Sequence, residues 1–258
     1  MTVELTIAEG VAEILLNEPG KLNALDEQAI ADLSDAYTQA AEAGVRAVLL
    51  HGEGRAFCAG RDISNVDPAT DDAEGYLSRV VTPLLTQIDA FPAPTFAIAT
   101  GACLGIGLGL LIASDVVYVA DTAKIGSPFA NLGATLDSGG HALFFERLGA
   151  HRTLDLIYTA ELISGTEAVQ LGLFSRVVPQ AEILAFTRAR VSRVAAGATQ
   201  AFLASKRLVH QLRDERVGLW PSLAAENAAQ GALGGSADYA EGFAAFQEKR
   251  KPVFTGLA

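Results

Sequence analysis

The sequence predicts an α/β protein with a mixed sheet and a helical C-terminal part. Three short apolar runs have the continuous hydrophobicity of strands that are covered on both faces: residues 46–52, 95–101 and 116–120. Helical patterns separate them, and strands that alternate with helices are typical of βα units. From about Ala181 onward the pattern is almost wholly helical and rich in alanine. With 258 residues, half of them apolar, the chain can bury one large core.

The first elements are expected to be two strands and a helix. Residues 3–17 alternate between apolar and polar positions on both sides of a Glu-Gly pair, which is the pattern of an antiparallel hairpin. In residues 26–44 acids fill the first turn and Gly44 suits the C-terminal stop. The apolar positions at helical spacing are Ile30, Leu33, Tyr37, Ala40 and Ala41. Because the start is antiparallel, we expect a mixed sheet.

Residues 90–114 carry no charge and are long enough to cross a bilayer. Pro92 and Pro94 break the start of this segment, glycines interrupt its middle, and the positive flanks of a spanning helix are missing. We therefore predict no membrane span. A buried strand followed by a core helix over residues 108–113 explains the segment better.

The remaining organisation is a polar loop and three helices. Residues 63–79 are acidic and loop-like at their start, which fits a solvated loop better than a flap over a site. Residues 181–196, 199–212 and 221–233 have helical patterns and are expected to form an appendage.

Charge and composition exclude several classes of partner. The 19 Lys and Arg residues against 30 Asp and Glu residues give a net charge of -11, which disfavours binding to nucleic acid. Two cysteines without CxxC spacing and four histidines without a cluster predict a reducing cytoplasm and no metal site. The N-terminus shows no targeting pattern, so we expect a cytoplasmic protein.

Two turns rich in small residues follow predicted strands. The stretch "GIGLG", residues 105–109, lacks the third glycine and the later acid of a dinucleotide fingerprint. The stretch "GRAFCAGRDI", residues 54–63, follows the preceding strand in the same way. Two such turns on adjacent strands can aim N–H groups at one oxyanion, and one such donor can lower a barrier by about 3 kcal/mol. Either turn alone is explained by tight turning.

Five stretches follow one another over nearly the whole chain: "NEPGKLNALD", "GRAFCAGRDI", "GACLGIGLGLLIASDVVYVA", "SGTEAVQLGLFSRVVP" and "GFAAFQEKRKPVF". Together, in their order and spacing, they resemble the crotonase superfamily, the enoyl-CoA hydratases and isomerases. The resemblance implies a crotonase-like spiral of ββα units with a C-terminal helical trimerisation region. We accordingly expect a core over residues 1–195 that holds the acyl-CoA site, and a helical oligomerisation region over residues 196–258. A homotrimer or a hexamer of two trimers is implied.

The resemblance also implies a coenzyme A thioester as substrate, and no cofactor beyond the coenzyme A moiety. The thioester oxygen becomes enolate-like and is held by two backbone N–H groups. By position these belong to Arg61 and Ile106. Many relatives have alanine in place of Arg61, so its side chain is free for another role or points to solvent.

Hydratases of the family use two glutamates, and Gly109 and Phe129 stand at those positions here. Without both carboxylates the chain has no obvious pair to handle water, which disfavours plain hydration. Asp137 is the remaining acid in this neighbourhood. Apolar residues surround it in sequence, and burial among them would raise its pKa toward that of a general base. Taken alone, Asp137 is better explained as the cap of a helix that begins near Ser138.

The resemblance changes the interpretation of Asp137. Enoyl-CoA isomerases carry a single acid near this position, and ring-epoxide isomerases of phenylacetyl-CoA derivatives carry the same "DSGG". One base and an oxyanion hole suffice to move a double bond. The 4-chlorobenzoyl-CoA dehalogenases hold a nucleophilic aspartate here, which remains a weaker alternative. A triad of Asp137, Ser138 and His141 is disfavoured, because no GxSxG elbow is present.

Further residues are expected to bind the substrate. Lys21, Phe246 and Lys249 match family positions that meet the nucleotide end of coenzyme A, the last two often from a neighbouring subunit. Lys249 is explained equally well by a solvated basic C-terminus. The remaining candidates for binding the substrate or its coenzyme A moiety are Ala59, Asp62, Ile63, Phe129, Leu132 and His141.

The preferred prediction is an acyl-CoA isomerase that shifts a double bond, or rearranges a ring, with Asp137 as proton shuttle. Hydration, or another lyase or hydrolase reaction on a coenzyme A thioester, is the first alternative. The missing glutamates leave a third, a non-catalytic acyl-CoA binding protein.

Overall fold

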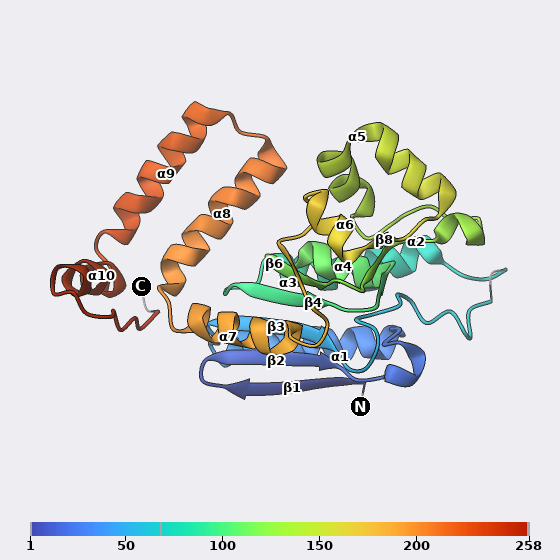
Figure 1. The fold of residues 1–258 in the computed structure, drawn as a ribbon, viewed down its shortest axis with the longest axis horizontal. Helices are drawn as coiled ribbons and strands as arrows, with labels where there is room; N and C mark the ends of the chain where they lie inside the picture. Colours follow the sequence, from blue (N-terminus) through green and yellow to red (C-terminus); the bar gives the residue numbers. More distant parts are fainter. Residues whose placement is uncertain (1, 68, 257–258) are drawn as a thin grey trace.

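A computed structural model describes residues 2–67 and 69–256 (Figure 1). Within them, a six-stranded sheet has the order β1-β2-β3-β4-β6-β9 and a smaller sheet has the order β5-β7-β8. The strands of the larger sheet are β1 (Val3–Ala8), β2 (Val11–Leu16), β3 (Ala47–Gly52), β4 (Thr95–Ala99), β6 (Val116–Ala120) and β9 (Arg176–Val178). Those of the smaller sheet are β5 (Ala102–Leu104), β7 (Lys124–Gly126) and β8 (Ile163–Ser164).

The larger sheet is mixed, as predicted. β1 and β2 form an antiparallel hairpin in which Val3 lies opposite Leu16. The neighbours β2 to β3, β3 to β4, β4 to β6 and β6 to β9 are all parallel. The three predicted apolar strands are β3, β4 and β6, and all five residues of β4 are buried. Parallel strands of this kind direct their carboxyl ends, and the turns that follow, to one edge.

Helices cover both faces of this sheet. α1 (Glu27–Glu42) begins at Asp26, whose carboxylate accepts a hydrogen bond from the N–H of Ala29. Its predicted apolar positions are buried except Ala41, which is exposed because it lies one residue beyond the inward-facing stripe. α7 (Ile183–Ala195) lies across the other face (Figure 1). The expectation that α7 belongs to an appendage was wrong: its apolar stripe packs on β3 and β4.

The helix α4 (Ile106–Ala113) is the predicted core helix, and nearly all of its residues are buried. It packs against α3 (Thr82–Asp89) and α5 (Gly140–Thr159), the second of which is interrupted at Gly149. The shorter helical elements are η1 (Pro19–Lys21), α2 (Ala73–Tyr76), η2 (Leu77–Val81), η3 (Phe129–Leu132) and α6 (Gly165–Gln170). Across residues 2–67 and 69–256, no helix combines the length and the hydropathy that crossing a membrane requires.

Three helices follow α7: α8 (Thr199–Glu215), α9 (Leu219–Leu233) and α10 (Ala237–Gln247). α8 and α9 match the predicted helices, whereas α10 was not foreseen. They extend to one side of the α/β part (Figure 1). The chain end returns to that part, because Arg46 donates hydrogen bonds to the carbonyl of Phe254 at 3.1 Å and to that of Gly197. The domain boundary expected after residue 195 stays a prediction.

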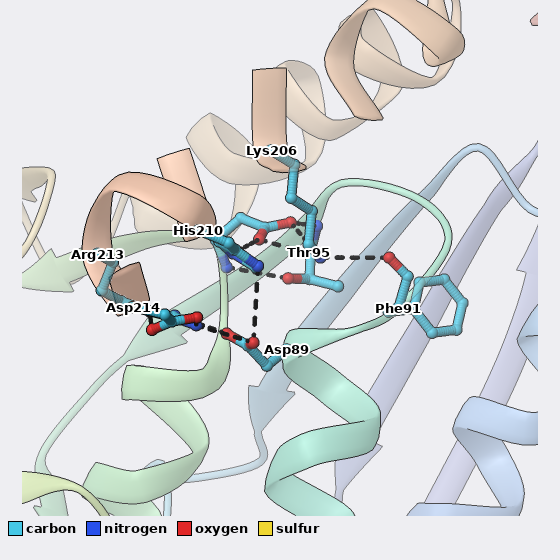
Figure 2. Close-up of polar contacts among 8 residues, drawn as sticks. Asp89, Phe91, Thr95, Lys206, His210, Arg213 and Asp214 are labelled. Atoms are coloured by element: carbon cyan, nitrogen blue, oxygen red, sulfur yellow. Dashed lines mark hydrogen bonds and ion pairs between the residues drawn. The ribbon is translucent and has the colours of Figure 1, made fainter. Parts of the chain in front are cut away.

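A polar cluster attaches α8 to the α/β part (Figure 2). The Lys206 ammonium lies 3.1 Å from the Asp115 carboxylate, at the start of β6. Arg213 forms a two-pronged pair with Asp89 at the end of α3, at 2.8 and 3.1 Å. His210 stands between the two acids, 3.6 Å from Asp89 and 3.8 Å from Asp115. α8 is therefore held by charged groups as well as by packing.

Candidate active site

The two turns predicted to bear the oxyanion donors lie side by side. Cys58 and Cys103 face each other in an isolated parallel bridge. The N–H of Cys58 donates to the carbonyl of Ala102, and the N–H of Leu104 donates to the carbonyl of Cys58, both at 3.0 Å. This pairing brings the turn after β3 against the turn after β4, three residues before each donor.

Close backbone contact explains the glycine that precedes each donor. Gly60 and Gly105 both have positive φ, +101° and +53°. A Cβ on Gly60 would lie 3.0 Å from the carbonyl oxygen of Leu104. A Cβ on Gly105 would lie 3.0 Å from the ring of Phe129. The predicted pocket residue Phe129 therefore flanks this turn.

The N–H groups of Arg61 and Ile106 donate no hydrogen bond within the described part of the chain. The groups on either side of the Arg61 N–H are used, because Leu25 donates to the Gly60 carbonyl and Asp62 donates to the Leu25 carbonyl, both at 2.8 Å. Ile106 is the first residue of α4, where N–H groups have no intrahelical acceptor. The positive end of a helix dipole also favours negative charge there. Two free donors on adjoining turns can stabilise an oxyanion.

Gly109 stands against the turn that carries Asp137. A Cβ on Gly109 would lie 2.6 Å from the Cβ of Ser138 and 3.1 Å from its carbonyl oxygen. Ile112 lies one turn further along α4, and a Cβ on Gly139 would lie 3.5 Å from its side chain. The space that a glutamate at position 109 would enter is thus filled by Ser138. The same packing brings Asp137 to the helix that begins with Ile106.

The Asp137 carboxyl is half-buried and accepts a hydrogen bond of 2.8 Å from the Ser138 hydroxyl. Burial raises its pKa above the ordinary value, while the hydrogen bond from Ser138 and the charge of His141 act in the opposite direction. The expectation that Asp137 caps the following helix was wrong. α5 begins after Gly139, whose left-handed conformation makes the turn, and no side chain caps the helix.

The surroundings of Asp137 are less enclosed than its sequence neighbours suggest. Leu136 and Phe144 are buried, but Leu132 is 64% exposed and His141 lies exposed on the first turn of α5. The Ser138 hydroxyl donates to Asp137, so these side chains are not ordered as a catalytic triad.

The Arg61 side chain has a partner that the sequence did not reveal. Its guanidinium donates two hydrogen bonds to Asp71, at 2.9 and 2.8 Å, and lies 3.9 Å above the centre of the Tyr76 ring. The hydrogen bonds from Arg61, together with its charge, lower the pKa of the Asp71 carboxyl. The polar segment that follows Ile63 is therefore tied to the donor turn, rather than merely solvated as expected. Residue 68 lies outside the described residues.

Several predicted binding residues gather beside Arg61. The Lys21 ammonium lies 2.8 Å from the Asp62 carboxylate. Both line a cavity of about 180 Å³ together with Arg61 and Tyr76. Ala59 donates its N–H to the carbonyl of Leu22 at 3.0 Å, which ties the donor turn to the Lys21 segment. Ile63 follows Asp62 in the chain and is 55% exposed, but it does not line this cavity.

Phe246 and Lys249 are not brought to this place within one chain. Phe246 is 84% exposed on α10, and Lys249 follows the end of that helix. α10 lies at the opposite end of the molecule from α2, and α4 lies between them in this view (Figure 1). A larger cavity, of about 500 Å³, lies between α8 and α9 and includes none of the predicted site residues. In the described residues, no cluster of three or more His, Cys, Asp or Glu side chains is arranged to hold a metal ion.

Comparisons with known proteins place the whole chain. Residues 6–257 match the family model described as enoyl-CoA hydratase/isomerase. A Rhodobacter capsulatus protein named "Probable enoyl-CoA hydratase" is 36% identical over 255 residues, covering 99% of this chain and 98% of the relative. The 1,2-epoxyphenylacetyl-CoA isomerase of Escherichia coli is 32% identical over 256 residues, covering 97% of each chain. The crystal structure of enoyl-CoA hydratase from Bacillus anthracis superposes with a TM-score of 0.90 at 28% identity, covering 100% of both chains. The chain has the crotonase fold and belongs to the enoyl-CoA hydratase/isomerase family.

Proposed function

We propose that this enzyme is an acyl-CoA isomerase in which Asp137 carries a proton beside a thioester. The thioester oxygen accepts hydrogen bonds from the N–H groups of Arg61 and Ile106. The observation that carries the proposal is the packing of the Asp137 turn on Gly109. It places a half-buried carboxyl by the helix that begins with Ile106 and fills the place of a hydratase glutamate.

The reaction needs one base and one electrophilic site. The Asp137 carboxylate takes a proton from C2 of a 3-enoyl thioester, and the electron pair of that C–H bond moves into the thioester to give a dienolate. The two N–H groups stabilise the negative charge on its oxygen. The same carboxyl then returns the proton at C4, which leaves the double bond between C2 and C3. Atoms and charge balance without water and without any cofactor beyond the coenzyme A moiety.

The environment of Asp137 suits both steps. Burial raises the pKa of this carboxyl, so its proton affinity is greater than that of a solvated aspartate. A base with a pKa closer to the working pH is more effective at taking a proton and then returning it. The name of the Escherichia coli relative, an isomerase of an epoxide, supports rearrangement chemistry of this type.

Hydration is the second candidate, because other relatives carry hydratase names. Addition of water needs a group that activates the water and a second that manages the proton. Asp137 would have to act with a substrate group or a second water. Loss of the conjugated absorbance of crotonyl-CoA on incubation with the enzyme would favour this candidate, and a stable absorbance excludes it for that chain length.

The test of the proposal is exchange of the C2 protons of a bound 3-enoyl-CoA with deuterium from the solvent. Asp137→Asn is expected to abolish exchange while thioester binding is kept, because the amide cannot accept the proton. Asp155→Asn is the matched control, since Asp155 is an exposed acid on α5, the helix that follows the Asp137 turn. Exchange that persists in Asp137→Asn and matches that of the control contradicts the assignment.

A further inference from the structure

Ser138 has an unusual backbone conformation for its residue type. Its φ is +52°, in the left-handed region that glycine adopts without cost and other residues adopt at about 1 kcal/mol or more. The two residues that follow it are glycines, so the chain has small residues throughout this turn. Backbone strain of this kind concentrates at functional sites, so the contacts of the Ser138 side chain bear on whether it has a role.

Within the described part of the chain, the side chain of Ser138 makes one hydrogen bond, and it is to the proposed base. Its hydroxyl donates to Oδ1 of Asp137 at 2.8 Å. The other carboxylate oxygen, Oδ2, has no hydrogen-bond partner among the residues that the structure describes. The two oxygens of the base therefore differ, one held and one open to a ligand.

Ser138 is itself held in place by a glycine on another element. A Cβ on Gly109 would approach the Cβ of Ser138 to 2.6 Å, closer than real Cβ atoms approach one another. The side chain of Leu85 on α3 bounds the same space, because it would lie 3.2 Å from a Cβ on Gly109. Any side chain at position 109 must therefore displace Ser138, and with it the hydrogen bond to Asp137.

We propose that Ser138 is a positioning residue that fixes Asp137 through Oδ1 and leaves Oδ2 to carry the proton. Glycine is required at position 109 because only the absence of a side chain there leaves room for Ser138. The inference rests on the proposed function in one respect, namely that Asp137 transfers a proton. The coupling of positions 109, 137 and 138 stands without it. The residue types at positions 109 and 138 then depend on each other. A carboxylate side chain at position 109 and the observed turn at Asp137 cannot occupy the same space.

Few charged groups of the described residues face Asp137. His141, on the first turn of α5, is the charged side chain among them that acts on its pKa. α4 and η3 contain no ionisable residue. α3 carries Asp89 at its far end, where that acid pairs with Arg213. A change in the titration of Asp137 after substitution of Ser138 thus reports on the hydroxyl contact.

The first experiment compares wild type, Ser138→Ala and Ser138→Gly by the ¹³C signal of the Asp137 carboxyl as pH is varied. The hydroxyl donates to the charged form, so its loss is expected to raise the pKa of Asp137 in both variants. Ser138→Gly relieves the left-handed strain and keeps the test valid if Ser138→Ala folds poorly. Ser205→Ala is the control, because the Ser205 hydroxyl donates only to its own helix, α8. An unchanged titration in the Ser138 variants overturns the inference.

The second readout is the C2 exchange reaction. The rise of the exchange rate with pH should move to higher pH in Ser138→Ala, and the plateau should fall roughly tenfold to a hundredfold because the base is less well oriented. A lower plateau with an unmoved pH profile contradicts positioning through Oδ1. If the wild type itself shows no exchange while its Asp137 titration responds to Ser138, the proposed function fails and the positioning role stands.

The packing of Ser138 against Gly109 is tested by a double-mutant cycle. Gly109→Ala is expected to lower the melting temperature and to raise the pKa of Asp137, because the new methyl group displaces Ser138. In the Ser138→Gly background the same substitution should cost much less stability, since the Cβ that it overlaps is gone. Equal losses in the two backgrounds would show that Gly109 and Ser138 are independent.

Discussion

Arg61 contributes two different groups, and they face different tasks. Its N–H is one of the free donors at the paired turns. Its guanidinium holds Asp71 and covers the Tyr76 ring, so it fixes the segment that follows the donor. The donor role proposed for its main chain came from its position in a stretch that resembles the family. The side-chain role could not, because nothing in the sequence shows that Asp71, ten residues on, folds back over the turn.

Replacement of Arg61 separates these two contributions. Arg61→Ala keeps the N–H donor but releases Asp71, so faster amide hydrogen exchange is expected over residues 69–76. Asp71→Asn should give a similar increase, and the double variant no more than either alone, because all three remove one interaction. Arg79→Ala, which breaks an exposed pair with Asp72, is the control. Additive effects of the Arg61 and Asp71 substitutions would show that the pair does not hold the segment.

Asp137 illustrates how the environment of the proposed base opposes stability. Its pKa is raised in the folded protein, so the folded state favours the protonated form. This preference costs nothing below the pKa of the unfolded chain, near 4, and destabilises the fold progressively as pH rises through the folded value. Asp137→Asn is neutral at every pH and retains a side-chain oxygen for Ser138.

We therefore expect Asp137→Asn to melt at the same temperature as the wild type near pH 4, and above it near pH 8. The measurement is thermal unfolding at the two pH values, with Asp155→Asn as the exposed control. A variant that melts with the wild type near pH 4 but below it near pH 8 would mean that the pKa is lowered instead.

At the scale of elements, local pattern predicted those whose apolar residues are either continuous or regularly spaced. The hairpin, α1 and the parallel strands β3, β4 and β6 follow from their own residues. α10 was missed, and α7 was assigned to the wrong part, because packing partners decide both and these are remote in sequence. β8 is two residues long and exists only through its pairing with β7.

The site divides in the same way. The two glycine turns and the Asp137 turn could be located from the sequence, since small residues and a lone acid mark them. The contacts among these three turns could not be derived from spacing. They depend on the bridge between Cys58 and Cys103 and on the packing of Ser138 against Gly109. Ser138 was adjacent to the proposed base but had no signal of its own apart from that position.

The attachment of α8 offers a test at this scale. Lys206→Met removes the ammonium that lies 3.1 Å from Asp115, in a pair whose side chains are only 11% and 18% exposed. The loss is expected to cost about 2 kcal/mol, because Asp115 keeps its charge in a partly buried place. Urea unfolding measures it, and Lys251→Met, on an exposed residue near the chain end, provides the control. A cost no larger than that of the control would mean that packing alone holds α8.

At the scale of the whole molecule, the predicted site residues lie at two ends. Arg61, Ile106 and Asp137 belong to the α/β part, whereas Phe246 and Lys249 lie on and after α10 (Figure 1). The helices between these ends expose large apolar side chains, with Trp220 on α9 74% exposed. Exposed apolar surface of this extent is typical of an interface between subunits. We propose a trimer, alone or paired into a hexamer, in which α10 of one subunit completes the site of its neighbour.

Mixing two inactive variants tests this arrangement. Asp137→Asn lacks the base and Lys249→Glu is expected to weaken binding of the nucleotide end of the substrate, so each pure variant should have little activity. If Lys249 serves a neighbouring subunit, each mixed trimer refolded from an equal mixture contains one complete site. In that site the Lys249→Glu chain supplies Asp137 and the Asp137→Asn chain supplies Lys249. Random assortment into closed rings then restores about a quarter of wild-type activity. If Lys249 serves the site of its own chain, every site in the mixture lacks one of the two groups, and the activity of the mixture stays at the average of the two pure variants.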